Sequence, residues 1–236
     1  MEKKKLNKTT KSNLITYGMV LAAYLIVQGM IAGNLLSNLM QGLLVPLCVY
    51  IILALSLNLT VGILGELSLG HAGFMCIGAF TSAAFTKATM DTFTNAGLRF
   101  FVALIIGAVC AGIFGFLIGI PVLRLKGDYL AIVTLAFGEI IKNLINILYV
   151  GVDKNGIHAT TTSSGLELAA GGKKIMKGAL GISGTATLYK DIKPYFFLIG
   201  VILVLLTLFI VQNLVHSRSG RAVMSTRDNR IAAESV

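Results

Sequence analysis

The sequence predicts an all-α protein, a polytopic bundle of about six transmembrane helices, and three observations support this fold class. Hydrophobic residues make up 56% of the 236-residue chain and charged residues only 13%, about half the charged fraction of a soluble domain. Six apolar segments are each long enough to cross a bilayer as a helix. Glycine is abundant and proline is rare, a balance that suits closely packed membrane helices.

The six expected spans follow one another along most of the chain. The first apolar segment follows a lysine-rich start and runs for about 20 residues, which is longer than the core of a cleavable signal peptide. We therefore interpret it as an uncleaved signal anchor. The spans are expected at residues 14–33, 39–61, 67–86, 100–123, 129–150 and 195–214.

Basic residues between the spans predict the orientation, because short cytoplasmic connections carry an excess of Lys and Arg. The opposite short connections hold only Lys87 and Arg99. Both termini are therefore expected to be cytoplasmic. The chain then divides into a basic tail (1–13), a transmembrane domain (14–214) with an extracytoplasmic loop (151–194), and a cytoplasmic segment (215–236). The basic residues that share the cytoplasmic side are Lys3, Lys4, Lys5, Lys8, Lys11, Arg124, Lys126, Arg218, Arg221, Arg227 and Arg230.

The net charge of +10 follows from this topology rule and needs no nucleic-acid partner. No basic face with interleaved aromatic residues is present in the sequence, as a nucleic-acid surface would require. The lipid bilayer is the expected surrounding of the chain.

Ionisable residues inside the apolar segments are the strongest functional signal. Glu139 and Lys142 are three residues apart, so they can meet on one helix face, and their cost in lipid predicts that they face protein or water. Two interpretations stay open, a neutralising pair that fixes helix packing and a polar lining of a translocation path.

The stretch 61–73, V-G-I-L-G-E-L-S-L-G-H-A-G, combines four glycines with Glu66 and His71. It is either a short re-entrant or broken helix, or a plain loop; non-helical backbone at membrane depth needs protein or a water-filled cavity around it. His71 is either a hydrogen-bonded packing residue or a proton relay.

No motif indicates catalysis or a bound cofactor. The A-A-G-G-K-K stretch (169–174) lacks the spacing of a phosphate-binding loop. The three cysteines lie in apolar runs without metal-ligand spacing. We expect no catalytic, cofactor-binding or metal-binding residues, so the chain is not an enzyme and any ATPase is another chain.

The end of the chain, residues 217–236, is basic and follows the last span directly. Ala222, Val223, Thr226 and Ile231 lie near one face of an expected amphipathic helix, with the arginines mostly on the other. Such a helix either lies on anionic lipid or docks a cytoplasmic partner.

Three stretches together resemble the permease subunits of ATP-binding-cassette (ABC) importers for branched-chain amino acids. They are A-L-S-L-N-L-T-V-G-I-L-G-E-L-S-L-G-H-A-G-F (54–74), L-R-L-K-G-D-Y-L-A-I-V-T-L-A-F-G-E-I (123–140) and G-R-A-V-M-S-T-R-D-N-R-I-A-A-E-S (220–235). The resemblance is to the subunit whose central segment reads G-D-Y-L-A-I-V-T-L. Urea and short-amide permeases carry similar motifs.

The resemblance implies a bacterial inner-membrane transporter in which this chain works together with three kinds of partner chain. This chain would pair with a second, homologous permease subunit, two cytoplasmic ABC ATPases and an extracytoplasmic substrate-binding protein. The implied cargo is leucine, isoleucine or valine. The polar residues of the matching stretches are the expected translocation path: Asn58, Glu66, Ser68, His71, Tyr129, Thr134, Glu139 and Lys142.

By position, the last matching stretch corresponds to the coupling helix that sits in a groove of the ATPase. The residues carried over to it are Gly220, Arg221, Arg227, Asp228, Ala232, Ala233 and Glu234. Arg230 departs from relatives, which often carry an acidic residue there. Family members usually continue with further spans after this segment, so the chain is expected to be C-terminally truncated relative to the family.

Three alternatives stay open beside the branched-chain amino acid importer. A urea or short-amide ABC permease would share the motifs. A stand-alone secondary carrier or channel would use Glu139, Lys142 and His71 and would transport without an ATPase. An inactive permease fragment would insert and bind partners without moving any substrate.

Overall fold

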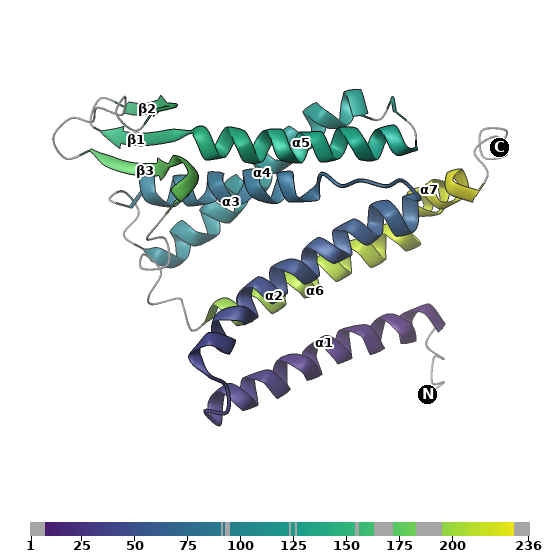
Figure 1. Cartoon of the computed structure of the whole chain (residues 1–236). Helices are drawn as coiled ribbons and strands as arrows, with labels where there is room; N and C mark the ends of the chain where they lie inside the picture. Colours follow the sequence, from purple (N-terminus) through teal and green to yellow (C-terminus); the bar gives the residue numbers. More distant parts are fainter. Residues whose placement is uncertain are drawn as a thin grey trace. The chain divides into compact units, whose positions relative to one another are not determined.

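Helices dominate the computed structural model, which describes residues 8–90, 92, 95–122, 124, 125, 127–153, 156–162, 172–182 and 195–228 (Figure 1). The chain divides into two compact units. Unit 1 comprises Met1–Gly65 and Pro194–Val236, and unit 2 comprises Glu66–Lys193. Each unit has its own apolar cluster and is described here by itself.

Unit 1 contains helices α1 (Lys8–Ala32), α2 (Asn38–Leu57), α6 (Phe196–His216) and α7 (Arg218–Asp228), with a π-helical turn η1 (Asn58–Leu64) that continues α2. Helices α2 and α6 pack side by side (Figure 1) around Cys48, Val201, Val204 and Leu208. Their close approach depends on Gly200, where an added Cβ would lie 3.0 Å from Cys48 Cβ.

Unit 2 contains helices α3 (His71–Ala88), α4 (Ala96–Val122) and α5 (Asp128–Ile147). Helix α3 packs on α4 through small residues, and an added Cβ on Gly107 would lie 2.7 Å from the carbonyl oxygen of Gly78. Helix α3 also packs on α5, where a Cβ on Gly73 would lie 3.1 Å from Gly138 Cα. Small residues at both contacts let the backbones approach closely, as in many membrane helix pairs.

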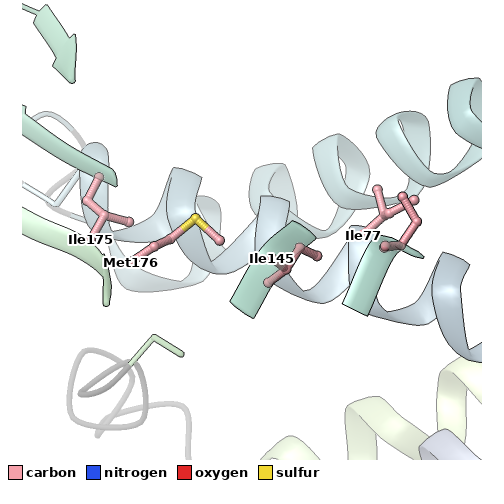
Figure 2. Packing of buried hydrophobic residues seen from close by; sticks show 5 residues of the cluster. Ile77, Ile145, Ile175 and Met176 are labelled. Atoms are coloured by element: carbon pink, nitrogen blue, oxygen red, sulfur yellow. The ribbon is translucent and has the colours of Figure 1, made fainter. Parts of the chain in front are cut away.

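A small antiparallel sheet follows α5, with strands β1 (Tyr149–Asp153), β2 (Gly156–Thr160) and β3 (Lys173–Lys177) in the order β2-β1-β3. Figure 2 shows Ile175 and Met176 of β3 beside Ile145 of α5 and Ile77 of α3. These buried side chains pack the sheet against α3 and α5. The sequence predicted a polar loop from residue 151, and the sheet corrects this expectation. Helix α5 ends at Ile147 and β1 begins at Tyr149, so the strand starts inside the expected fifth span.

The prediction of a polytopic helical bundle is confirmed. Five segments of the described residues are long and apolar enough to cross a membrane: Asn13–Ala32, Asn38–Leu64, Ala96–Val122, Asp128–Ile147 and Phe196–His216. The expected span at 67–86 is the exception. Helix α3 begins only at His71, has 18 residues and carries His71 and Lys87 near its ends, so it is shorter and less apolar than the sequence suggested.

Candidate translocation path and coupling segment

The stretch 61–73 is a broken helix rather than a plain loop. The π-helical turn η1 ends at Leu64, and the next residue, Gly65, adopts φ +81°, a left-handed conformation that glycine adopts without steric cost. Residues 66–69 are non-helical, and α3 starts at His71. Asn58 opens η1, and its side-chain oxygen fills the space beside Gly62, where an added Cβ would clash.

Thr134 of α5 holds the non-helical segment in place. The backbone N–H of Leu69 donates a 3.0 Å hydrogen bond to Thr134 Oγ1, and that hydroxyl donates at 3.0 Å to the carbonyl of Ala131. Thr134 is buried. Gly70 permits the contact, since a Cβ there would lie 2.9 Å from the carbonyl oxygen of Thr134. The bond gives a partner to a backbone N–H of the non-helical segment.

His71 begins α3 next to this contact and is partly buried. Its Nδ1 is buried and makes no hydrogen bond to any described residue. Ser68 and Glu66 are also partly buried and precede it in the non-helical segment. Ser68 and His71 therefore flank Leu69 and Gly70, the two residues whose backbone contacts Thr134.

Glu139 and Lys142 form the predicted ion pair on the opposite side of α5. Lys142 Nζ donates to both carboxylate oxygens of Glu139, at 3.2 and 3.3 Å. The Glu139 side chain is 56% exposed and the Lys142 side chain 60% exposed. Because Thr134 and Glu139 are five residues apart, they point to different faces of the helix. The eight residues expected along one path therefore fall into separate groups.

The exposed face of α5 carries two polar residues that the expected path did not include. Asn143 and Asn146 are exposed one and two turns beyond Glu139, at the i+4 and i+7 positions that share its face. Together with Lys142 they form a polar stripe about 10 Å long, from the middle of α5 to its C-terminal end. The repeat at i, i+3, i+4 and i+7 is the signal that identifies it. Tyr129 is also exposed but lies at the other end of the helix.

The expected coupling segment is a helix over Arg218–Asp228, and its start is tightly built. Ser217 Oγ accepts the N–H of Gly220 at 3.0 Å and donates to the carbonyl of Leu214 at 2.6 Å. Gly220 is buried, and an added Cβ would lie only 2.0 Å from that carbonyl oxygen. Gly220 therefore belongs to the junction between α6 and α7 and does not present a contact surface. Arg221 is exposed and donates to the carbonyl of His216.

Arg227 ties α7 to the π-helical turn of the same unit. Its guanidinium donates to the carbonyl of Gly62, and its aliphatic carbons lie over Gly65, where an added Cβ would approach Arg227 Cγ to 2.9 Å. Nothing in the sequence signalled this contact between residues 165 positions apart. Gly62 lies in the last turn of η1, where carbonyl groups have no partner within the helix. Asp228 ends α7, and Ala232, Ala233 and Glu234 lie outside the described residues.

Comparisons with known proteins show to which family the chain is similar. Residues 39–236 match the family model described as the permease component of the branched-chain amino acid transport system. The chain is 38% identical over 195 residues to the high-affinity branched-chain amino acid transport system permease protein LivM of Escherichia coli K12, and 37% identical to LivM of Salmonella typhimurium LT2. Each alignment covers 80% of this chain and 44% of the relative.

The chain thus spans less than half the length of these curated relatives. No solved structure matches it significantly. The family match covers most of the chain, including the broken helix, α5 and the segment after α6. The chain therefore belongs to the branched-chain amino acid transport permease family, as a multi-pass protein of the bacterial inner membrane.

Proposed function

We propose that this chain is a membrane-spanning subunit of an ABC importer that moves leucine, isoleucine or valine into the cell. The observation that carries the proposal is the exposed Glu139–Lys142 pair in the middle of an apolar helix. An ion pair at this depth is stable only against protein or water. Since the stripe continues through Asn143 and Asn146, it fits a water-filled vestibule that α5 lines from its midpoint to its extracytoplasmic end.

The charge pattern of this stripe suits an amino acid in its zwitterionic form. A carboxylate and an ammonium group 3.2 Å apart match the two charges of the substrate backbone, whereas urea or a short amide carries neither charge. The broken helix beside Thr134 offers a second polar neighbourhood, with His71 and Ser68. Unwound segments of this kind frequently form substrate sites in transporters.

Alternating access would be driven from the cytoplasmic side by two ATPase chains. Helix α7 is the proposed coupling helix, and Arg221 and Ser225 are exposed on it. Arg227 would carry its movement to the π-helical turn through the Gly62 carbonyl. A second permease subunit and an extracytoplasmic substrate-binding protein complete the proposed complex.

Neutralising the ion pair in two steps separates a packing role from a path role. Glu139→Gln leaves Lys142 uncompensated, and the double change Glu139→Gln/Lys142→Gln removes both charges. We expect the single change to lower both the yield of folded protein and ATP-driven leucine uptake in proteoliposomes. The double change should restore the yield but not the uptake, because the path then lacks its charges.

The control is Asn213→Ala, an exposed polar position on α6, which should change neither quantity. If the double change restores uptake as well as yield, the pair only neutralises itself and the path role is wrong. Leucine uptake without ATP but with an ion gradient would indicate a secondary carrier, and preferential uptake of urea would indicate an amide permease.

A further inference from the structure

Three helices of unit 1 border a long apolar groove with a volume of about 320 Å³. The residues that line it recur every three or four positions on α1, α2 and α6, within 16–27, 44–55 and 197–208. At 1.5 Å per residue, the groove runs about 16 Å along the helices. All three stretches lie inside segments that are long and apolar enough to cross a membrane. Hydrocarbon therefore surrounds the groove.

Helix α1 makes this groove because it packs on its neighbours through few side chains. Tyr17, Val20 and Tyr24 contact the apolar cluster of α2 and α6, and the ring of Tyr24 lies 5.5 Å from that of Phe197. Ala23 lines the groove and stays exposed. The family match begins at residue 39, so the groove depends on a helix outside it. The space beside Ala23 must be filled, because atoms next to a void lose their dispersion contacts.

The shape of the groove suits a hydrocarbon chain and not a further helix. A helix 10–12 Å wide takes up roughly 1,300–1,800 Å³ over this length, several times the volume of the groove. A chain whose atoms keep about 4 Å from their neighbours is about 4–5 Å wide and takes up roughly 200–300 Å³. Where helices of this protein do approach closely, Gly73, Gly107 and Gly200 permit it, as is common in membranes. The described residues that line the groove include no glycine.

Charge lies at one end of the groove, as far as unit 1 is described. Helices α2 and α6 run parallel, because α7, which follows α6, is bonded to η1, which continues α2. Helix α1 runs antiparallel to them, since a short connection joins its end to the start of α2 (Figure 1). The start of α1 therefore shares an end with α7, and this end is basic. The described Lys, Arg, Asp and Glu residues of unit 1 all belong to it: Lys8, Lys11, Arg218, Arg221, Arg227 and Asp228.

Arg227 lies at the level of the headgroup of a lipid whose chain fills the groove. The residue to which it is bonded, Gly62, follows Leu55, the last groove residue of α2, by about 10 Å along the helix. The headgroup region begins where the hydrocarbon ends and is about 5–8 Å deep. Arg227 is exposed, and its guanidinium has five N–H donors, of which the bond to Gly62 uses one. The others can bind a phosphate.

We propose that the groove between α1, α2 and α6 holds one acyl chain of an anionic phospholipid, whose phosphate lies near Arg227. The groove would select the chain by its shape, and the basic end would select the phosphate by its charge. The chain would stabilise α1 against α2 and α6 by filling the space beside Ala23. The inference does not rest on the proposed transport function.

Tryptophan fluorescence tests this site, because the chain has no Trp of its own. Tyr24→Trp places a single tryptophan in the groove. Leu25→Trp, at an exposed position of α1 outside the groove, is the matched control at the same depth. The full chain is placed in phosphatidylcholine nanodiscs with a small fraction of lipid brominated in its acyl chains. The readout is the ratio of quenching by brominated phosphatidylglycerol to quenching by brominated phosphatidylcholine.

One cation near an anionic headgroup raises its occupancy several-fold, so the ratio for Tyr24→Trp should be about three times that for Leu25→Trp. Adding Ala23→Phe to Tyr24→Trp fills the groove and should lower the ratio to that of Leu25→Trp. Adding Ala22→Phe, at an exposed position outside the groove, should leave the ratio unchanged. If the Ala23→Phe variant does not fold, the comparison of the two tryptophan positions decides alone.

Two results would overturn the proposal. Equal ratios at the two tryptophan positions would mean that the groove holds only the lipid of the surrounding bilayer, without selection. A Tyr24→Trp variant that stays unquenched when every lipid is brominated would mean that protein covers the groove.

Discussion

Replacing Gly220 with alanine tests whether the start of α7 is as tightly built as the structure shows. The added Cβ would lie 2.0 Å from the carbonyl oxygen of Leu214 and 2.8 Å from that of Val215, whereas a carbon and a carbonyl oxygen normally stay about 3.3 Å apart. The obstacle is the backbone of the last turn of α6, which has no flexible end to move aside. The junction must open by roughly 1 Å.

The expected cost follows from overpacking and from the bonds that the shift breaks. Overpacking costs about 1–3 kcal/mol. The bonds from Gly220 N–H to Ser217 Oγ and from Ser217 Oγ–H to the Leu214 carbonyl contribute about 1 kcal/mol each. A total of about 3–5 kcal/mol raises the detached population of α7 by roughly 100-fold or more. The loss should stay local, because α6 keeps its packing on α2.

Hydrogen–deuterium exchange in nanodiscs measures this loss directly. Gly220→Ala should speed exchange of the α7 amides by at least ten-fold and leave the middle of α6 unchanged. Ser219→Ala, at an exposed neighbouring position, is the matched control and should behave like the wild type. If Gly220→Ala leaves α7 protected, or if α6 loses protection as well, the described junction is wrong.

Three further predictions concern helix contacts and coupling. Gly107→Ala should lower the free energy of unfolding of the detergent-solubilised protein by about 1–3 kcal/mol, because the added Cβ clashes with the α3 backbone. Gly112→Ala is the control and should have no effect, because a Cβ there enters open space. Equal effects of the two changes in a thermal unfolding experiment would refute the close α3–α4 contact. Arg227→Gln should speed amide exchange in η1 several-fold because it removes the bond to a π-helical carbonyl, and Arg221→Gln should not; unchanged exchange in both variants would refute the link. Glu234→Arg should abolish substrate-stimulated ATP hydrolysis without preventing membrane insertion, because it reverses a charge in the proposed coupling segment; normal stimulation would count against that role.

The helices could be predicted from the sequence because their signals are local. Apolar length predicted six spans, of which the described residues contain five, and the separation of three residues predicted the Glu139–Lys142 pair. The start of α3 could not be placed, because the apolar residues Leu67 and Leu69 look helical until Thr134, 65 residues away, binds the backbone of Leu69. A hydrogen bond between distant segments leaves no periodic signal in the sequence.

The sheet was missed for a related reason. Strand β3 reads K-K-I-M-K, with exposed side chains on both sides of two buried ones, and this pattern lacks the strict alternation that identifies a strand. The pairing of β1 with β3 shifts register between Val150, which pairs with Met176, and Gly151, which pairs with Lys174. Such a bulge places two successive residues of β3 against the core, which explains the pattern.

The grouping of the expected path residues could not be predicted from the sequence. Thr134 and Glu139 were both expected along one path, yet one is buried and the other exposed. A sequence gives the angle between two side chains on a helix but does not say which face a neighbour covers. The place of Gly220 could not be predicted either, because a glycine in this motif is compatible with a surface that contacts a partner and with a crowded junction between two helices.

The measurement that tests the account most directly is site-specific photo-crosslinking from α7 in native membranes. A photoreactive residue is placed at Ser225, which is exposed on the proposed coupling helix, and at Ile202, which is exposed on α6 within a membrane span. Adducts are then identified by mass spectrometry. We predict an adduct with an ABC ATPase from Ser225 and none from Ile202. An adduct with lipid alone from Ser225 would contradict the coupling role of α7 and, with it, the importer mechanism proposed for this chain.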